Sequence, residues 1–446
     1  MRTLLLTDRD GRLLTIKELS LYWLAIAFFA TLFLPPSMPV INNITIGAIA
    51  LLCFGYNPVK EKGQLLRSRP AVICMLLFFA LELVSAAVSV DQHRAWFVIG
   101  VRSSLLIFPL SLGLITVHGV LRRRILLAYV VILLLVSLCC LTDAIHRAWI
   151  RHDTQWLYDD SLTLLIGRTS VYMALLVVLA IAGLASLLES GFAAGRAKWA
   201  AYGCIGFFLL FHFLLASRIS MFYLYTTIVL YVAIRMINGQ KPGRKIATLA
   251  GVVVLVGASL IVFPKTLNRF RQLQYTHYDY HSRGMESHYN MAVTPDQWNS
   301  ANFRLAVWAC GLALAEKHPV TGVPLGDKQA RLMEEYKARD FMFAYTRHRN
   351  LHSTWLDVLV NTGIPGLAIF LLGYLVFPVL TAIKNKDWLS LVMVGAFATA
   401  MTTETWIDGS FGTIGLAFWL SLIGAWGKPK PSLPLKPPLL PIVPQV

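Results

Sequence analysis

Long apolar runs recur along the chain and constrain its fold more than any other feature. As helices, runs of roughly 17–25 residues match the hydrocarbon thickness of a bilayer, where backbone groups must be paired within the protein. The chain is 57% hydrophobic and 14% charged, a balance foreign to soluble domains. We therefore predict an all-α polytopic membrane protein with about twelve transmembrane helices. The predicted spans are 19–35, 39–56, 70–90, 96–115, 124–142, 168–188, 199–216, 219–237, 246–264, 364–383, 388–404 and 411–426.

Basic residues predict the orientation of these spans. The formal charge is +17, and Lys and Arg concentrate in the cytoplasmic loops of membrane proteins. Basic residues precede the first predicted span and follow every even-numbered one, so we expect both termini to be cytoplasmic. No basic stripe interleaved with aromatic residues marks a soluble module, so nucleic acid is not a predicted partner. Membrane lipids are a predicted partner.

The spans and loops divide the chain into four segments. Residues 1–264 are predicted to form a transmembrane bundle of about nine helices, and 353–427 about three more. Between them, 265–352 form a large loop on the outer side, and 428–446 form a Pro-rich cytoplasmic tail. Two helices are expected in the loop. One is "ANFRLAVWACGLALAEK", closed by His-Pro and a Gly, and the other is the amphipathic "KQARLMEEYKARDFMF".

Two arginines on the outer side are candidate phosphate ligands. Arg218 lies in "LLASRIS", where two predicted spans are joined by almost no loop and hold the side chain rigidly. Such a guanidinium suits bidentate phosphate binding, although an interface arginine can also simply snorkel. Arg304 lies early on the first loop helix, where a salt-bridged surface arginine is the structural alternative.

Arg102 lies inside the fourth predicted span. An arginine within the membrane normally faces a cavity or a partner. Glu82 in the third span could be that partner, which makes a structural ion pair the alternative to substrate binding. Arg168, at the outer start of the sixth span, is a lesser candidate of the same kind.

His352 stands in "RHRNLHSTWLDVLVNTGIPG", which brings basic residues directly against an apolar run. A neutral imidazole there can accept a proton from a hydroxyl near neutral pH. The alternative is a structural hydrogen bond that fixes the loop on the bundle. The residues Asn361–Gly366 are predicted to break the following helix and to leave His352 in a cavity below the loop.

No metal site or cofactor is predicted. There is no HExxH motif, and the adjacent acidic pair on the outer side has no third ligand nearby. The six cysteines show neither a disulfide framework nor zinc spacing. Arginines can neutralise a diphosphate without a metal, and the acid-poor, arginine-rich outer face favours that arrangement.

Taken together, these features resemble the bacterial O-antigen ligase family, within the O-antigen ligase/polymerase superfamily. The stretch "NFRLAVWACGLALAEKHPVTGVPLG" is similar to its Arg…Trp…His-Pro…Gly pattern, through Arg304, Trp308, His318, Pro319, Gly322 and Gly326. The stretch "HSTWLDVLVNTGIPGL" is similar to its His-Asn/Ser-x-aromatic-Leu…Gly…Gly motif, through His352, Ser353, Trp355, Leu356, Gly363 and Gly366. Ser353, where Asn is frequent, and Pro324, within a glycine-rich turn, depart from the family pattern.

The resemblance implies a GT-C-like glycosyltransferase of the bacterial inner membrane with a periplasmic active site. Such enzymes take a polysaccharide from undecaprenyl diphosphate, and a ligase passes it to the lipid A–core oligosaccharide without a metal. By position, the family's essential residues correspond to Arg218, Arg304 and His352. We expect the two arginines, assisted by Arg102, to hold the diphosphate. His352 would activate the acceptor hydroxyl, and the reaction would invert the anomeric centre.

Several alternatives remain open from the sequence. An O-antigen polymerase and a protein O-oligosaccharyltransferase would use the same lipid-linked donor. A transporter of lipid-linked glycans belongs to a different class and would distribute charge through the midplane of the bundle, whereas here the conspicuous charges crowd the outer interface. The loop aromatics Tyr275, Tyr278 and Trp298 could line a glycan path or form the core of the loop.

Overall fold

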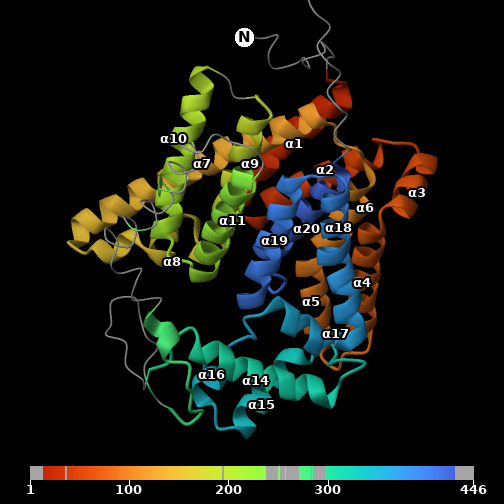
Figure 1. Cartoon of the computed structure of the whole chain (residues 1–446). Helices are drawn as coiled ribbons and strands as arrows, with labels where there is room; N and C mark the ends of the chain where they lie inside the picture. The colour runs from red at the N-terminus through yellow and green to blue at the C-terminus, as the bar shows by residue number, and fades with distance from the viewer. Residues whose placement is uncertain are drawn as a thin grey trace, which may run out of the picture.

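The computed structural model describes residues 14–35, 38–192, 195–237, 250–251, 257, 271–282, 284 and 297–426, and these residues are predominantly helical (Figure 1). The helices that precede the large loop are α1 (Ile16–Leu32), α2 (Pro39–Phe54), α3 (Val59–Ser68), α4 (Pro70–Ala87), α5 (Gln92–Arg102), α6 (Ser104–Leu110), α7 (Gly119–Arg151), α8 (Asp159–Leu162), α9 (Ser170–Glu189), α10 (Arg196–Leu214) and α11 (Arg218–Ile237). The loop contributes α14 (Asn302–Lys317), α15 (Lys328–Ala338) and α16 (Met342–Thr346). The last helices are α17 (Thr354–Leu371), α18 (Phe377–Lys384), α19 (Trp388–Thr403) and α20 (Ser410–Ala425).

Within the described residues, each predicted span coincides with a helix or a run of consecutive helices. Six of these helices are long and apolar enough to cross a membrane, or seven if α2 and α3, bent by 103°, form one span. Three shorter apolar helices, α11, α19 and α20, accompany them. The chain is thus a helical membrane protein, and the number twelve stays a prediction. The predicted span 246–264, except for three residues, and the tail 428–446 lie outside the described residues.

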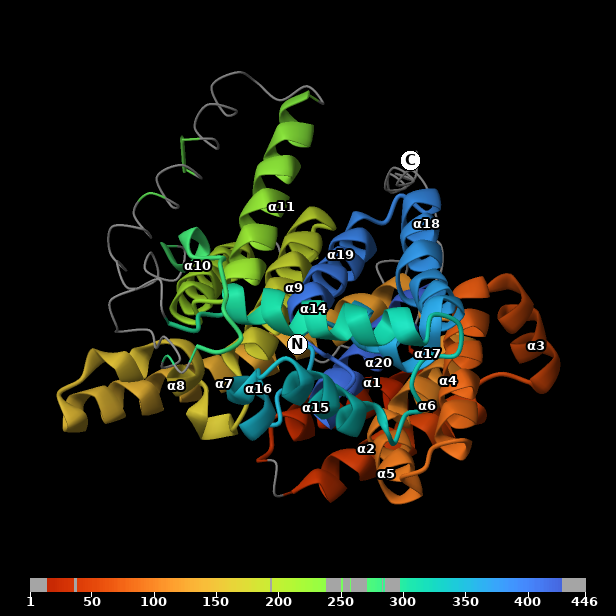
Figure 2. The same cartoon turned by 90° about the horizontal axis from the view of Figure 1, so that it is seen from below.

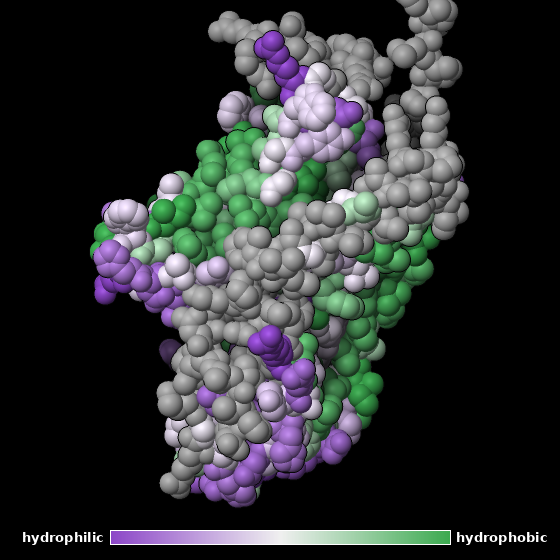
Figure 3. All heavy atoms as spheres, turned by 60° about the vertical axis from the view of Figure 1, so that its left-hand side comes forward, coloured by the Kyte–Doolittle hydropathy of each residue, from purple (hydrophilic) through white to green (hydrophobic). Residues whose placement is uncertain are grey.

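The surface separates into an apolar and a polar part. Figure 3 shows hydrophobic side chains over the middle of one face and hydrophilic side chains mainly at its lower end, where Figure 1 places α14, α15 and α16, with smaller hydrophilic patches at its upper end and left edge. Large apolar side chains such as Trp149 and Phe222 are 80% and 66% exposed. Water would disfavour that exposure and lipid would not, so such apolar surface suits a bilayer.

Residues 297–352 form a small helical unit, here called the loop domain. It lies across the end of the bundle in Figure 2. Its core contains Trp298, Phe303, Tyr336 and Phe341, with Tyr278 packed against it. For these two predicted loop aromatics, Tyr278 and Trp298, the structure therefore shows core packing.

Two close backbone approaches attach the loop domain to α17. Val323 donates its backbone N–H to the carbonyl of Val360, and Ile364 donates to that of Pro319. Gly322 (φ 67°) and Gly363 (φ 64°) adopt left-handed conformations there, and a Cβ on Gly322 would overlap the carbonyl group of Asn361. The expected break in the helix is confirmed, because Gly363 separates two helical halves of α17. Two glycine motifs far apart in sequence thus form one joint.

We expect Gly322→Ala to loosen this joint. The new Cβ meets backbone that cannot rotate away, and the left-handed conformation disfavours it further, at a combined cost of about 3 kcal/mol. Thermal unfolding in detergent and proteolysis of the loop domain measure the effect. Gly415→Ala is the matched control, since nothing lies within 4 Å of a Cβ at Gly415. Equal stability of the two variants would contradict the role of the joint.

Candidate active site

Arg218 begins α11 directly after the turn that leaves α10. The turn includes Ala216, which is fully buried and has a left-handed φ of 51°. Across it, His212 Nε2 and Ser220 Oγ lie 2.8 Å apart. The predicted near-absence of a loop between these helices is confirmed, and it fixes where the guanidinium of Arg218 emerges.

Arg304 reaches from the first turn of α14 to the end of α19. Its Nε donates to the carbonyl of Thr403 (3.0 Å), its Nη1 to that of Ser300 (2.9 Å), and its Nη2 to Oε1 of Glu404 (2.9 Å). A guanidinium has five N–H donors, so one further N–H on each Nη is available. The charge of Arg304 also acts on Arg218, which places the two predicted phosphate ligands in one neighbourhood.

Glu404 joins Arg304 to His352. Its Oε1 accepts from Arg304, and its Oε2 lies 3.5 Å from Nδ1 of His352. Both side chains of this second pair are mostly buried, 21% exposed for His352 and 19% for Glu404. A carboxylate beside Nδ1 favours the tautomer in which Nε2 is free to accept a proton.

The backbone around His352 is held from several directions. The residue has a left-handed φ of 46°, its N–H donates to Oδ1 of Asn350, and its ring packs edge-on against Phe303. Thr354, fully buried, donates its hydroxyl to the carbonyl of Glu404 at 2.7 Å. The histidine and its carboxylate partner are therefore attached to each other through the backbone as well.

Glu404 stays ionised despite its burial. Burial alone would raise its pKa, but His352 and the charge of Arg304 more than offset that and hold the pKa of Glu404 below its ordinary value of 4.5. The carboxylate is thus charged throughout the neutral range. It can orient the imidazole and stabilise an imidazolium that forms beside it.

We expect Glu404→Gln to lower turnover roughly tenfold to a hundredfold, because the amide removes a charge that contributes about 1.5–3 kcal/mol to stabilising the imidazolium. A depressed pKa means that the stabilisation by the carboxylate is complete above 4.5 and is lost only as pH falls through the depressed value. Any limb of the pH–rate profile near neutrality should therefore persist in the variant, with a lower plateau. Asp340→Asn, which alters the exposed pair of Asp340 with His281, is the matched control. Disappearance of the neutral limb in Glu404→Gln would contradict this assignment.

Arg102 belongs to a buried ion network, and its hydrogen bonds do not include these groups. Its Nη1 donates to both oxygens of Glu82 (2.6 and 2.7 Å), and its Nη2 to Asp357 (3.1 Å). Lys328 of α15 pairs with Asp357 and with Asp408. The side chain of Arg102 is 0% exposed. The structure thus shows the ion pair with Glu82 that was the alternative for Arg102, and its contact with a substrate phosphate stays a prediction.

The ion network and the site share one short connection, residues 404–409 between α19 and α20. Glu404 belongs to the site, and Asp408 accepts from Asn350 and pairs with Lys328. The sequence analysis missed both acids. The available signal was "TTETWIDGS", two carboxylates in a short turn between apolar runs, where membrane proteins seldom place charge without a partner.

Within the described residues, no three His, Cys, Asp or Glu side chains gather as a metal site would require. His352 has one carboxylate neighbour, and that carboxylate also pairs with an arginine. The absence of a metal from the mechanism stays a prediction, with a test given below.

Comparisons with known proteins bear on the segment that holds these residues. Residues 203–371 match the family model described as O-antigen ligase, and the match includes Arg218, Arg304 and His352. No curated protein matches the chain. The matched segment of this membrane protein therefore belongs to the O-antigen ligase superfamily, whose members are membrane glycosyltransferase-like ligases and polymerases.

Proposed function

We propose that the protein is an O-antigen ligase of the bacterial inner membrane. It transfers polysaccharide from undecaprenyl diphosphate to the lipid A–core oligosaccharide on the periplasmic side, completing lipopolysaccharide, with both termini in the cytoplasm. The observation that carries the proposal is the grouping of Arg218, Arg304, Glu404 and His352, which joins two interacting cations to a histidine–carboxylate pair.

In the proposed reaction, the acceptor hydroxyl attacks the anomeric carbon of the donor sugar. His352 takes the hydroxyl proton at Nε2, and Glu404 stabilises the resulting imidazolium. The new C–O bond forms as the bond to phosphate breaks, and the electron pair leaves on undecaprenyl diphosphate. Arg218 and Arg304 stabilise that growing negative charge. A single displacement inverts the anomeric centre.

The test is a ligation assay with purified protein, lipid-linked glycan and lipid A–core. A product that runs as glycosylated lipid A–core supports a ligase. Longer lipid-linked chains would indicate a polymerase, and a glycosylated Ser or Thr a protein O-oligosaccharyltransferase. Donor movement across vesicles with no product at all would instead indicate a transporter.

We expect chelation to leave ligation unchanged. If arginines neutralise the leaving diphosphate, EDTA removes nothing that the reaction needs. The measurement is the initial rate with and without EDTA, with a parallel sample in which a divalent cation is added back. A ligation rate that is abolished by EDTA and restored by the cation would contradict the metal-free mechanism.

A further inference from the structure

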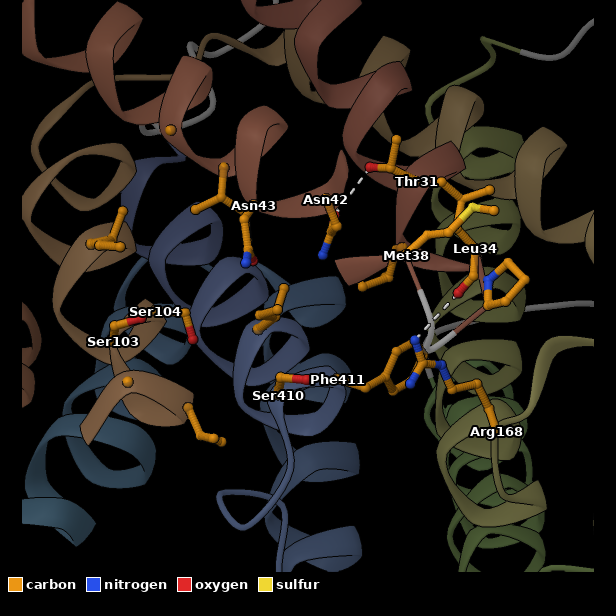
Figure 4. Close-up of a pocket in the computed structure, with 18 of the residues that line it drawn as sticks. Thr31, Leu34, Met38, Asn42, Asn43, Ser103, Ser104, Arg168, Ser410 and Phe411 are labelled. Carbon is orange, nitrogen blue, oxygen red and sulfur yellow. Dashed lines mark hydrogen bonds between the residues drawn. The ribbon is translucent and has the colours of Figure 1, made fainter. Parts of the chain in front are cut away.

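A further cation lies on the wall of a cavity that the proposed mechanism does not use. The cavity measures about 660 Å³ and lies between the α1–α2 turn, α5, α6 and the start of α20. Arg168, which precedes α9, forms part of its wall (Figure 4). Since α9 and α10 are consecutive and run in opposite directions, Arg168 and Arg218 lie at the same side of the bundle (Figure 1).

Arg168 is positioned for an anion. Its Nη2 donates to the carbonyl of Leu34 at 3.4 Å, its guanidinium lies 4.6 Å from the ring centre of Phe411, and its buried Nε has no hydrogen-bond partner. Over the described parts of the chain, no carboxylate lies within ion-pair distance of Arg168. Burial lowers its pKa. A half-buried guanidinium without a counter-charge matches a phosphate in charge and shape.

The remaining lining suits an amphiphile. Asn43, Ser103 and Ser410 bring polar groups to the cavity from three different elements (Figure 4). The apolar part of the wall includes Trp96 and Phe97, which are 51% and 67% exposed. A cation on one wall, polar groups across the cavity from it and exposed apolar side chains in the lining match a lipid head group with its chains in the bilayer.

The cavity and the proposed active site lie close together across the 404–409 connection. Glu404 begins that connection and Ser410 follows it, while Tyr172 of α9 packs against Trp406 (4.5 Å) and Phe411 (5.7 Å). The charges of both Arg168 and Glu404 act on Tyr172. A lipid head in the cavity would therefore lie one layer of aromatic side chains away from the His352–Glu404 pair.

We infer that this cavity binds the phosphorylated glycolipid acceptor, with a lipid phosphate on Arg168. The inference rests on the proposed function, which requires two amphiphiles to meet at His352. The donor diphosphate takes Arg218 and Arg304 on one side of the 404–409 connection. Arg168 and the polar groups on the other side suit a lipid phosphate and its sugar.

The test measures equilibrium binding of lipid A–core to purified full-length protein in detergent, with no donor present. Arg168→Gln should weaken binding roughly tenfold, and Gly47→Leu should weaken it comparably by filling the cavity. Gly47 lines the cavity with nothing within 4 Å of a Cβ, so the leucine has room without disturbing the fold. Arg151→Gln, an exposed arginine at the end of α7, and Gly203→Leu, an open glycine on α10, are the matched controls and should bind as the unaltered protein does.

Two further measurements identify the ligand. Phosphatase-treated lipid A–core should bind the unaltered protein weakly and lose nothing more in Arg168→Gln. Under turnover, Arg168→Gln should raise KM for the acceptor and leave KM for the donor unchanged. The inference is overturned if both cavity variants bind normally, if dephosphorylated acceptor binds equally well, if phosphatidylglycerol displaces the acceptor at equal concentration, or if KM for the donor rises instead.

Failure of this inference differs from failure of the proposed function. Acceptor binding that depends on Arg168, without any ligation product, would support the acceptor site and contradict the ligase function. Ligation, together with unaltered acceptor binding in Arg168→Gln and Gly47→Leu, would support the ligase function and contradict the acceptor site.

Discussion

Replacing His352 with alanine should lower the ligation rate by about 10²–10⁴, the usual contribution of a positioned general base. The acceptor hydroxyl then keeps its proton as it attacks, and Glu404 no longer has an imidazolium to stabilise. Acceptor and donor KM should change little, because the imidazole acts mainly in the transition state. The measurement is kcat and KM for both substrates, with thermal unfolding to confirm the fold.

His348→Ala is a closely matched control. His348 has nearly the same left-handed backbone conformation (φ 47° against 46°) four residues earlier, but its side chain is exposed. It should ligate at the unaltered rate. Full activity in His352→Ala, or equal losses in the two variants, would show that the histidine only shapes the turn.

Replacing Arg304 should produce the second large loss. Removing one donor that stabilises developing negative charge costs about 10²–10³ in rate, and Arg304→Lys should retain only part of the activity because an ammonium cannot offer the planar fork. Arg331→Ala, which removes an exposed arginine of α15, should leave the rate unchanged.

Arg304→Ala also leaves Glu404 ionised, buried and without its cation, which destabilises the protein. The double variant Arg304→Ala with Glu404→Gln separates the two effects. It should recover much of the thermal stability and remain as inactive as the single variant. Recovery of activity along with stability would show that Arg304 serves the fold and not the leaving group.

The structure also separates arginines that look alike in sequence. Arg102 and Arg218 both lie in or beside predicted spans, yet one is enclosed by Glu82 and Asp357 whereas the other interacts with a second cation. Periodicity cannot distinguish the two cases. Asp357, a neighbour of Arg102, lies more than a hundred residues away in the sequence, and Arg304, the neighbour of Arg218, belongs to the loop domain.

Composition and apolar run length determined that the chain is helical and membrane-bound, because lipid leaves the backbone few other ways to pair its polar groups. The motifs also identified the turn at Arg218, the break at Gly363 and the residues shared with the superfamily. The tertiary structure alone decided which charges meet. It brought Glu404 between Arg304 and His352, enclosed Arg102 in carboxylates, and left Arg168 on a cavity wall without a carboxylate in the described chain. The reason is physical: a buried charge is stabilised by groups within a few ångströms, and helix packing, not sequence distance, determines which groups lie that close.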